Sequence, residues 1–391
     1  MKLGWDFIRS LLHDTKDVQH VGIGNITGKI IMGVFWFYMA TLLGSENYGQ
    51  VIYLIALGSM GAAISMVGTS NAVIVYTAKK VPIASTLYSI ALILGIVAAI
   101  VLYIFSSNII VSIFTFGYIF YNLGVAHLLG NKLYKKYAII LIIQKVLFVS
   151  FALLFYYIIG FEGVVLGFAL SMLTFSYIVL KEFRNTKVDF KILKPRFGFM
   201  INNYALTIEK VLNGQVDKLI IAPLFGFALL GNYALSIQFL SIMLIIPSIV
   251  FQYTLSQDAT GHLSKKIKKI SIGSSIVVAC LGIVLSPIVI PIIFPDYVEA
   301  IQLIQIISLV VVPSSIILAY NSELLGKEKS RFVLIGQGIS VSVYLVGLLT
   351  LGLIIGINGV ATSLVLSSIC QAVFYIIIIR YLKNQEALRS N

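Results

Sequence analysis

Long apolar stretches follow one another along almost the whole chain, with little room between them. Stretches such as 87–105, 138–159 and 270–294 are long enough to cross a membrane, whose hydrocarbon core takes roughly 20 helical residues. Of the residues, 59% are hydrophobic and 11% are charged, whereas a soluble domain is typically about a quarter charged. The sequence therefore predicts an all-α protein embedded in a membrane.

Apolar runs, turn signals and charges together predict about twelve transmembrane helices. They are expected near residues 21–43, 49–77, 84–106, 109–130, 137–159, 163–181, 199–226, 231–254, 270–294, 299–321, 331–355 and 359–380. With the N-terminus inside, the inner segments collect the loop lysines and arginines, Lys268 among them, and the outer loops hold none. Cytoplasmic loops retain positive charge. We therefore expect a multi-pass protein of the plasma (inner) membrane with both termini in the cytoplasm.

A sequence repeat divides the chain near its middle. The motif Leu128-Leu129-Gly130 recurs as Leu324-Leu325-Gly326, and Ile158-Ile159-Gly160 recurs as Ile354-Ile355-Gly356, at a constant offset of 196 residues. A weaker echo pairs Tyr48, after the first helix, with Tyr233, after the seventh.

The repeat predicts a chain built from two halves. We expect a cytoplasmic lead-in at 1–20, an N-terminal six-helix bundle at 21–181, a connecting loop at 182–198, a C-terminal six-helix bundle at 199–380 and a tail at 381–391. Two six-helix halves share one orientation, so a pseudo-two-fold axis along the membrane normal should relate them. Such parallel repeats are typical of transporters in which one half rocks against the other. The alternative is that duplication only builds a stable bundle.

Four lysines fall inside predicted helices. They are Lys29 in the first helix, Lys145 in the fifth, and Lys210 and Lys218 in the seventh. A lysine near the centre of a transmembrane helix costs about 2.5–3.5 kcal/mol on insertion scales, and such residues usually mark functional sites.

The seventh helix carries a polar stripe. At helical spacing, Asn203, Lys210, Asn213, Gly214 and Asp217 fall on one face. Such a stripe cannot face lipid, and we expect it to line a water-filled or ligand-filled space.

These residues predict a binding site for an anionic headgroup, the phosphate or pyrophosphate of a carrier lipid. Lysine binds phosphate as a point charge through charge-assisted hydrogen bonds. The predicted substrate-binding residues are Lys29, Lys145, Lys210, Lys218, Asn25, Asn213, Asp217 and Gln144.

Each of these lysines also has a plainer interpretation. Lys210 and Lys218 could pair with the neighbouring acids Glu209 and Asp217, and Lys29 and Lys145 could extend to a membrane interface. His127 and Glu323 lie toward inner helix ends. There we expect solvated or capped side chains rather than a proton relay.

Several short stretches resemble Wzx-type polysaccharide flippases, within the multidrug/oligosaccharidyl-lipid/polysaccharide exporter superfamily. They are 40–49, 216–220, 230–233, 297–305 and 354–361. The resemblance implies two six-helix bundles enclosing a cationic cavity. It also implies translocation of a polyprenyl-linked oligosaccharide from the cytoplasmic to the outer leaflet, for surface polysaccharide biosynthesis. The chain departs from the family where Thr41 and Lys218 stand in place of arginine.

The expected partners follow from this resemblance. They are an anionic lipid-linked oligosaccharide and membrane lipid, with a polysaccharide polymerase and glycosyltransferases as candidate protein partners. The net charge of +13 fits positive cytoplasmic loops, and no nucleic-acid-binding module accompanies it. We expect no cofactor, no metal site and no enzymatic activity, because the sequence contains no Walker loop, zinc-ligand spacing or nucleophile elbow.

Two other functions remain open from the sequence. A cation-coupled multidrug exporter of the same superfamily would use intramembrane carboxylates, which are fewer here than the lysines. A membrane-embedded glycosyl or phosphoglycosyl transferase would need sizeable loops, and the predicted outer loops are short.

Overall fold

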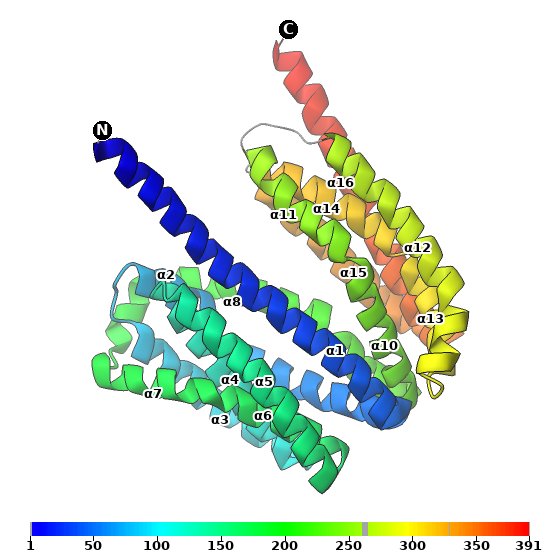
Figure 1. The fold of residues 1–391 in the computed structure, drawn as a ribbon, viewed down its shortest axis with the longest axis horizontal. Helices are drawn as coiled ribbons and strands as arrows, with labels where there is room; N and C mark the ends of the chain where they lie inside the picture. Colours follow the sequence, from blue (N-terminus) through cyan, green and yellow to red (C-terminus); the bar gives the residue numbers. More distant parts are fainter. Residues whose placement is uncertain (1, 260–264, 328, 391) are drawn as a thin grey trace. The chain divides into compact units, whose positions relative to one another are not determined.

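The computed structural model describes residues 2–259, 265–327 and 329–390, with the side chains of some helical residues, Lys210 and Asn213 among them, outside that description. The described residues form helices joined by short turns, without a strand among them (Figure 1). The predicted all-α fold is confirmed.

The helices follow the order of the apolar stretches. The first part of the chain contains α1 (Lys2–Met66), α2 (Thr69–Ala78), α3 (Ala84–Ser106), α4 (Ile109–Gly130), α5 (Tyr134–Ile159), α6 (Phe161–Met172), η1 (Leu173–Phe175), α7 (Ser176–Asn185), η2 (Phe190–Arg196), α8 (Phe197–Gly214) and α9 (Val216–Phe225). The second part contains α10 (Phe227–Met243), α11 (Ile245–Ala259), α12 (Lys265–Ile293), α13 (Val298–Ser308), α14 (Val311–Gly326), α15 (Ser330–Ile355) and α16 (Ile357–Ser390).

Two compact units contain these helices. Unit 1 comprises Met1–Met39 and Gln50–Leu219, and unit 2 comprises Ala40–Gly49 and Ile220–Asn391. The core of unit 1 includes Leu87, Tyr88 and Leu123, all fully buried. In unit 2, Leu324 and Tyr375 belong to a buried apolar cluster. The apolar faces that the sequence repeats along each helix therefore meet inside each unit.

Most of these helices suit a membrane. Among the described residues, eight helices are long and apolar enough to span one, or up to ten if α10 with α11 and α13 with α14 each form a bent span. The difference from twelve lies at two places. The stretch Thr27–Met66 of α1 is counted as one spanning helix, although the backbone at Gly44, with φ 70° and ψ 173°, is not helical. The other place is the polar stretch of α8 and α9.

The structure corrects the helix predicted at 49–77. That helix stops at Met66, and α2 starts at Thr69. Gly68, between them, has φ 71°, and a Cβ there would overlap the carbonyl oxygen of Met200. The chain therefore turns at Gly68, because only glycine allows both this conformation and this close approach.

The repeat in the sequence is also a repeat in the structure. The bounds of α5 and α15 differ by the same offset of 196 residues. Each helix ends at a glycine with positive φ, 75° at Gly160 and 66° at Gly356. Three residues later, a Cβ at Gly163 or Gly359 would overlap a carbonyl oxygen of the preceding helix. Glycine at these positions thus builds the same tight helical hairpin twice.

The weaker echo has a different offset from the predicted one. Gly44 (φ 70°, ψ 173°) and Gly226 (φ 88°, ψ 167°) share one unusual backbone conformation. They are 182 residues apart, so the prediction that paired Tyr48 with Tyr233 was wrong by three residues.

Candidate functional site

Helices α1 and α5 pack closely because glycines face the contact. A Cβ at Gly24 would lie 3.0 Å from the Cα of Ala138, and one at Gly28 would lie 3.7 Å from both Leu141 and Lys145. Small residues spaced by four let two helices approach in this way. The packing brings the predicted site residues of α1 beside those of α5.

Lys145 lies half-buried among aromatic rings. Its ammonium nitrogen is 5.6 Å from the ring centroid of Tyr121 on α4 and 5.9 Å from that of Phe168 on α6. No carboxylate among the described residues forms an ion pair with it. Cation–π contacts contribute about 0.5–1 kcal/mol each when partly solvated, which is less than the cost of about 2.5–3.5 kcal/mol for a central intramembrane lysine. The arrangement therefore leaves positive charge available to a ligand.

Asn25 and Lys29 are both exposed, one turn apart on α1. The Asn25 side-chain oxygen accepts a hydrogen bond of 2.8 Å from the Tyr137 hydroxyl on α5. Lys29 forms no ion pair with the described part of the chain. Asn25 thus joins α1 to α5. Lys29, one turn further along α1, adds a second ammonium group to that of Lys145 on α5.

Gln144 is fully buried between α5 and α6. Its amide nitrogen donates a hydrogen bond of 2.9 Å to the hydroxyl of Ser171. Its amide oxygen is buried without a hydrogen-bond partner in the described structure. This geometry gives Gln144 a role in joining two helices beside Lys145, and its contact with substrate stays a prediction.

Helix α8 is held in unit 1 by polar contacts. The Asn71 amide on α2 donates a hydrogen bond of 2.9 Å to Asn203, and the Arg196 guanidinium lies 5.2 Å from the ring centroid of Tyr76. The side chains of Lys210 and Asn213, which belong to the predicted stripe, lie outside the described residues.

Lys218 pairs with its neighbour in the sequence. Its ammonium nitrogen lies 3.1 Å from a carboxylate oxygen of Asp217, which is 5% exposed, and also donates to the carbonyl oxygen of Gly214. The helix breaks at Gln215 between α8 and α9. Lys218 is therefore partly neutralised locally, in contrast to Lys145.

Unit 2 contains a buried ionic cluster at the meeting of α11, α12 and α14. The Lys268 ammonium lies 2.5 Å from Asp258 and 4.0 Å from Glu323, and Lys327 lies 3.9 Å from Glu323. The Ser322 hydroxyl donates to Asp258. The expectation of a solvated or capped Glu323 was wrong, because this side chain is buried at 5% exposure.

The aromatic partners of Lys145 were not predicted from the sequence. Tyr121 lies in the aromatic run 114–121, and Phe168 lies in α6. Aromatic residues are common in all these helices, so their number gave no signal. In the described residues, no group of three or more His, Cys, Asp or Glu side chains is placed to hold a metal ion.

Known proteins resemble this chain at the levels of family and fold. The family model described as polysaccharide biosynthesis protein matches residues 38–255. No curated protein sequence matches significantly. The solved structure of the lipid II flippase MurJ in an inward closed conformation has a TM-score of 0.73 and 15% identity, covering 92% of this chain and 87% of that chain.

Two further solved structures share the architecture. An inward-facing multidrug resistance MATE family transporter of the MOP superfamily has a TM-score of 0.61 and 14% identity, covering 94% of this chain and 99% of that chain. A MOP superfamily transporter from Pyrococcus furiosus Vc1 has a TM-score of 0.57 and 15% identity, covering 94% of this chain and 95% of that chain. At these identities the likeness establishes the fold, which is the one expected from the sequence.

Proposed function

Because the chain belongs to the family of polysaccharide biosynthesis proteins, we propose that it flips a lipid-linked oligosaccharide from the cytoplasmic to the outer leaflet. The cargo is a sugar chain on a polyprenyl phosphate or pyrophosphate. The protein moves it by alternating access and forms no covalent bond with it. Both termini lie in the cytoplasm, and the product feeds the synthesis of a surface polysaccharide.

The observation that carries this proposal is the environment of Lys145. Its ammonium group lies near the rings of Tyr121 and Phe168 and forms no ion pair with a described carboxylate. A phosphate group supplies the counter-charge that such a lysine lacks. Lys29, on the helix packed against α5, adds a second positive charge. Lys210, whose side chain lies outside the described residues, is a third proposed contact on the sequence pattern alone, whereas Lys218, paired with Asp217, contributes less.

The same environment disfavours export of cationic drugs as the main function. A site for cations needs an available carboxylate, and Asp217 is the acid among the predicted site residues. Its oxygen lies 3.1 Å from the Lys218 ammonium. A cationic substrate would therefore meet more positive than negative charge in this part of the protein.

Export by lysine variants tests the proposal. A host lacking its own copy of the gene is complemented with the chain or with the triple variant Lys29→Ala/Lys145→Ala/Lys210→Ala, and surface polysaccharide is measured. We expect the triple variant to lose export while its amount in the membrane stays normal. In proteoliposomes, it should also fail to translocate a fluorescent polyprenyl-pyrophosphate oligosaccharide.

A matched control separates the site from general loss of charge. Lys187, Lys191 and Lys194 are exposed residues between α7 and α8, and their triple alanine variant removes the same charge. This control should export normally. Normal export by the site variant would refute the proposed site, and drug resistance without polysaccharide export in the wild type would favour the multidrug exporter.

A further inference from the structure

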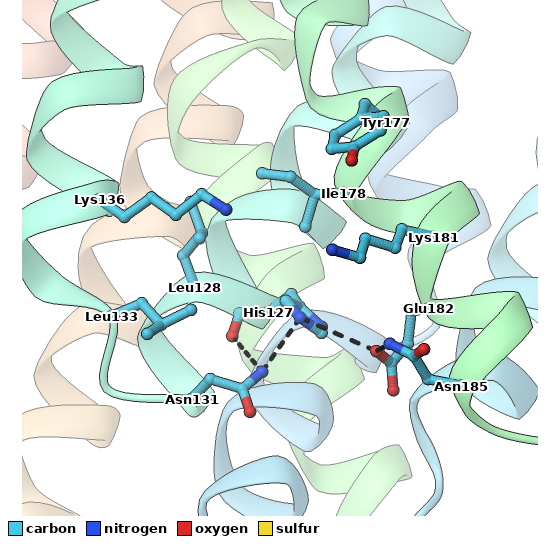
Figure 2. Close-up of a pocket in the computed structure, with 10 residues that line it drawn as sticks. All are labelled: His127, Leu128, Asn131, Leu133, Lys136, Tyr177, Ile178, Lys181, Glu182 and Asn185. Carbon is cyan, nitrogen blue, oxygen red and sulfur yellow. Dashed lines mark hydrogen bonds and ion pairs between the residues drawn. The ribbon is translucent and has the colours of Figure 1, made fainter.

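A polar pocket opens at the end of unit 1 that we predict to face the cytoplasm. Its volume is about 340 Å³, and it lies between the end of α4, the turn that follows, the start of α5, and α7 (Figure 2). It shares no residue with the proposed substrate site around Lys145. The pocket therefore calls for a separate explanation.

Two ammonium groups face each other across this pocket. Figure 2 shows the side chains of Lys136, from α5, and Lys181, from α7, extended toward one another from opposite sides. Neither lysine forms an ion pair with a carboxylate in the described structure. Both lysines are exposed, and an anion between them would be attracted by both ammonium groups.

The back of the pocket is held by a fixed imidazole. Nδ1 of His127 lies 2.9 Å from the hydroxyl of the buried Tyr88, and Nε2 lies 3.1 Å from the side-chain nitrogen of Asn131. These contacts hold the ring and the amide at the pocket wall. The Asn131 amide donates to Nε2 and to the backbone carbonyl oxygen of His127, so these two groups shape the wall of the pocket, and the two lysines supply the donors to an anion.

The one acid of the pocket is already engaged. Glu182 accepts hydrogen bonds from the Asn185 amide at 3.3 Å and the Thr186 hydroxyl at 3.4 Å, and it lies 3.9 Å from Nε2 of His127. Its carboxylate is therefore held by neighbours at the end of α7 and just after it. Two lysines against one glutamate leave the pocket with a net positive charge.

We propose that this pocket binds a phosphate group between Lys136 and Lys181. Lysine is suited to a phosphate that must also leave, because it binds as a point charge without a rigid bidentate clamp. The phosphate can come from a lipid of the neighbouring leaflet or from a soluble phosphate compound. The apolar side chains of Leu133 and Ile178, which also line the pocket, favour the lipid.

Lipid binding by the purified full chain tests this proposal. Native mass spectrometry in detergent measures the affinity for dioleoyl phosphatidic acid and for dioleoylglycerol, which differ only by the phosphate. The wild type should prefer phosphatidic acid. The double variant Lys136→Ala/Lys181→Ala should bind phosphatidic acid at least about tenfold more weakly, because charge-assisted hydrogen bonds are lost.

Three comparisons keep the result specific. Lys135→Ala/Lys187→Ala removes two exposed lysines near the pocket and should bind like the wild type. Lys136→Arg/Lys181→Arg should retain binding, and Lys136→Gln/Lys181→Gln should lose it. The glutamine pair also serves if the alanine pair does not fold, as judged by circular dichroism and size-exclusion chromatography.

The outcomes decide both the site and the source of the phosphate. In one outcome, inorganic phosphate displaces phosphatidic acid from the wild type and has no effect on the glutamine pair. This result supports the site and a soluble source of the phosphate. Lysine-dependent lipid binding that phosphate does not displace supports the site with a lipid source. Equal affinity for phosphatidic acid and dioleoylglycerol, or equal losses in the site and control pairs, would overturn the proposal. None of these results depends on polysaccharide export.

Discussion

The backbone of Gly49 lies so close to the carbonyl group of Phe227 that a Cβ at position 49 would overlap the oxygen. The contact is reciprocal, because a Cβ at Gly231 would overlap the carbonyl oxygen of Ser45. Two segments 182 residues apart thus cross each other through equivalent glycines. This crossing explains why residues 40–49 belong to unit 2 although the rest of α1 belongs to unit 1.

We predict that Gly49→Ala and Gly231→Ala each lower the free energy of unfolding by about 1–3 kcal/mol or more, because the added methyl group forces the backbones apart. A Cβ at Gly338, within α15, would instead meet open space, so Gly338→Ala should be neutral or stabilising by up to about 1 kcal/mol. Thermal unfolding in detergent measures both effects. Similar stability in all three variants would contradict the close crossing.

The buried cluster of unit 2 predicts a strongly asymmetric response to mutation. Lys268→Ala leaves Asp258 buried without its counter-charge, and should destabilise the protein by about 3–5 kcal/mol. The double variant Asp258→Leu/Lys268→Met should recover most of this loss, because it removes both buried charges. Lys269 is exposed, and Lys269→Ala should change stability by no more than about 0.5 kcal/mol. A loss in the double variant as large as in Lys268→Ala would refute this account.

Asn232 is predicted to stabilise the start of α13. Its side-chain oxygen accepts a hydrogen bond of 2.9 Å from the backbone N–H of Ala300, and the residue is 1% exposed. It thus caps a helix from a distant part of the chain. Asn232→Ala removes this bond but leaves the N–H its 3.0 Å contact with the carbonyl oxygen of Tyr297, so it should cost about 0.5–1.5 kcal/mol. The exposed Asn202 provides the control, and equal melting temperatures for Asn202→Ala and Asn232→Ala would show that the cap contributes nothing.

The charge of Lys145 should lower the stability of the protein and at the same time be required for export. Methionine has a similar shape without the charge, so Lys145→Met should raise the free energy of unfolding by about 1–3 kcal/mol and abolish export. Tyr121→Phe keeps the ring and should leave both properties close to the wild type. Surface polysaccharide and thermal unfolding, measured on the same variants, check the two effects. Full export by Lys145→Met would show that this charge does not contact the substrate.

The sequence repeat predicted the hairpins of α5 with α6 and of α15 with α16 well. There, one glycine with positive φ and another under a carbonyl group fix the local geometry, and both requirements are visible as fixed glycines in the sequence. The breaks between α1 and α2 and between α8 and α9 were not predicted. The first depends on what the backbone meets at Gly68, and apolar composition does not record such a contact.

For the candidate site, the sequence identified lysines that are costly inside a membrane. It offered Asp217 as a local partner for Lys218, but it did not identify the aromatic neighbours of Lys145. The structure places Lys218 against Asp217 and Lys145 among aromatic rings. It also pairs Lys268, which the sequence placed in an inner loop, with Asp258.

By itself the sequence determined that this chain is a helical membrane protein with an internal repeat and intramembrane lysines. Hydrophobic length, charge and glycine act locally, so each can be read from neighbouring residues. Only the tertiary structure decided which charges are neutralised and which remain available. That outcome depends on side chains that helix packing brings together from distant parts of the chain, and the free energy of a buried charge depends on those partners.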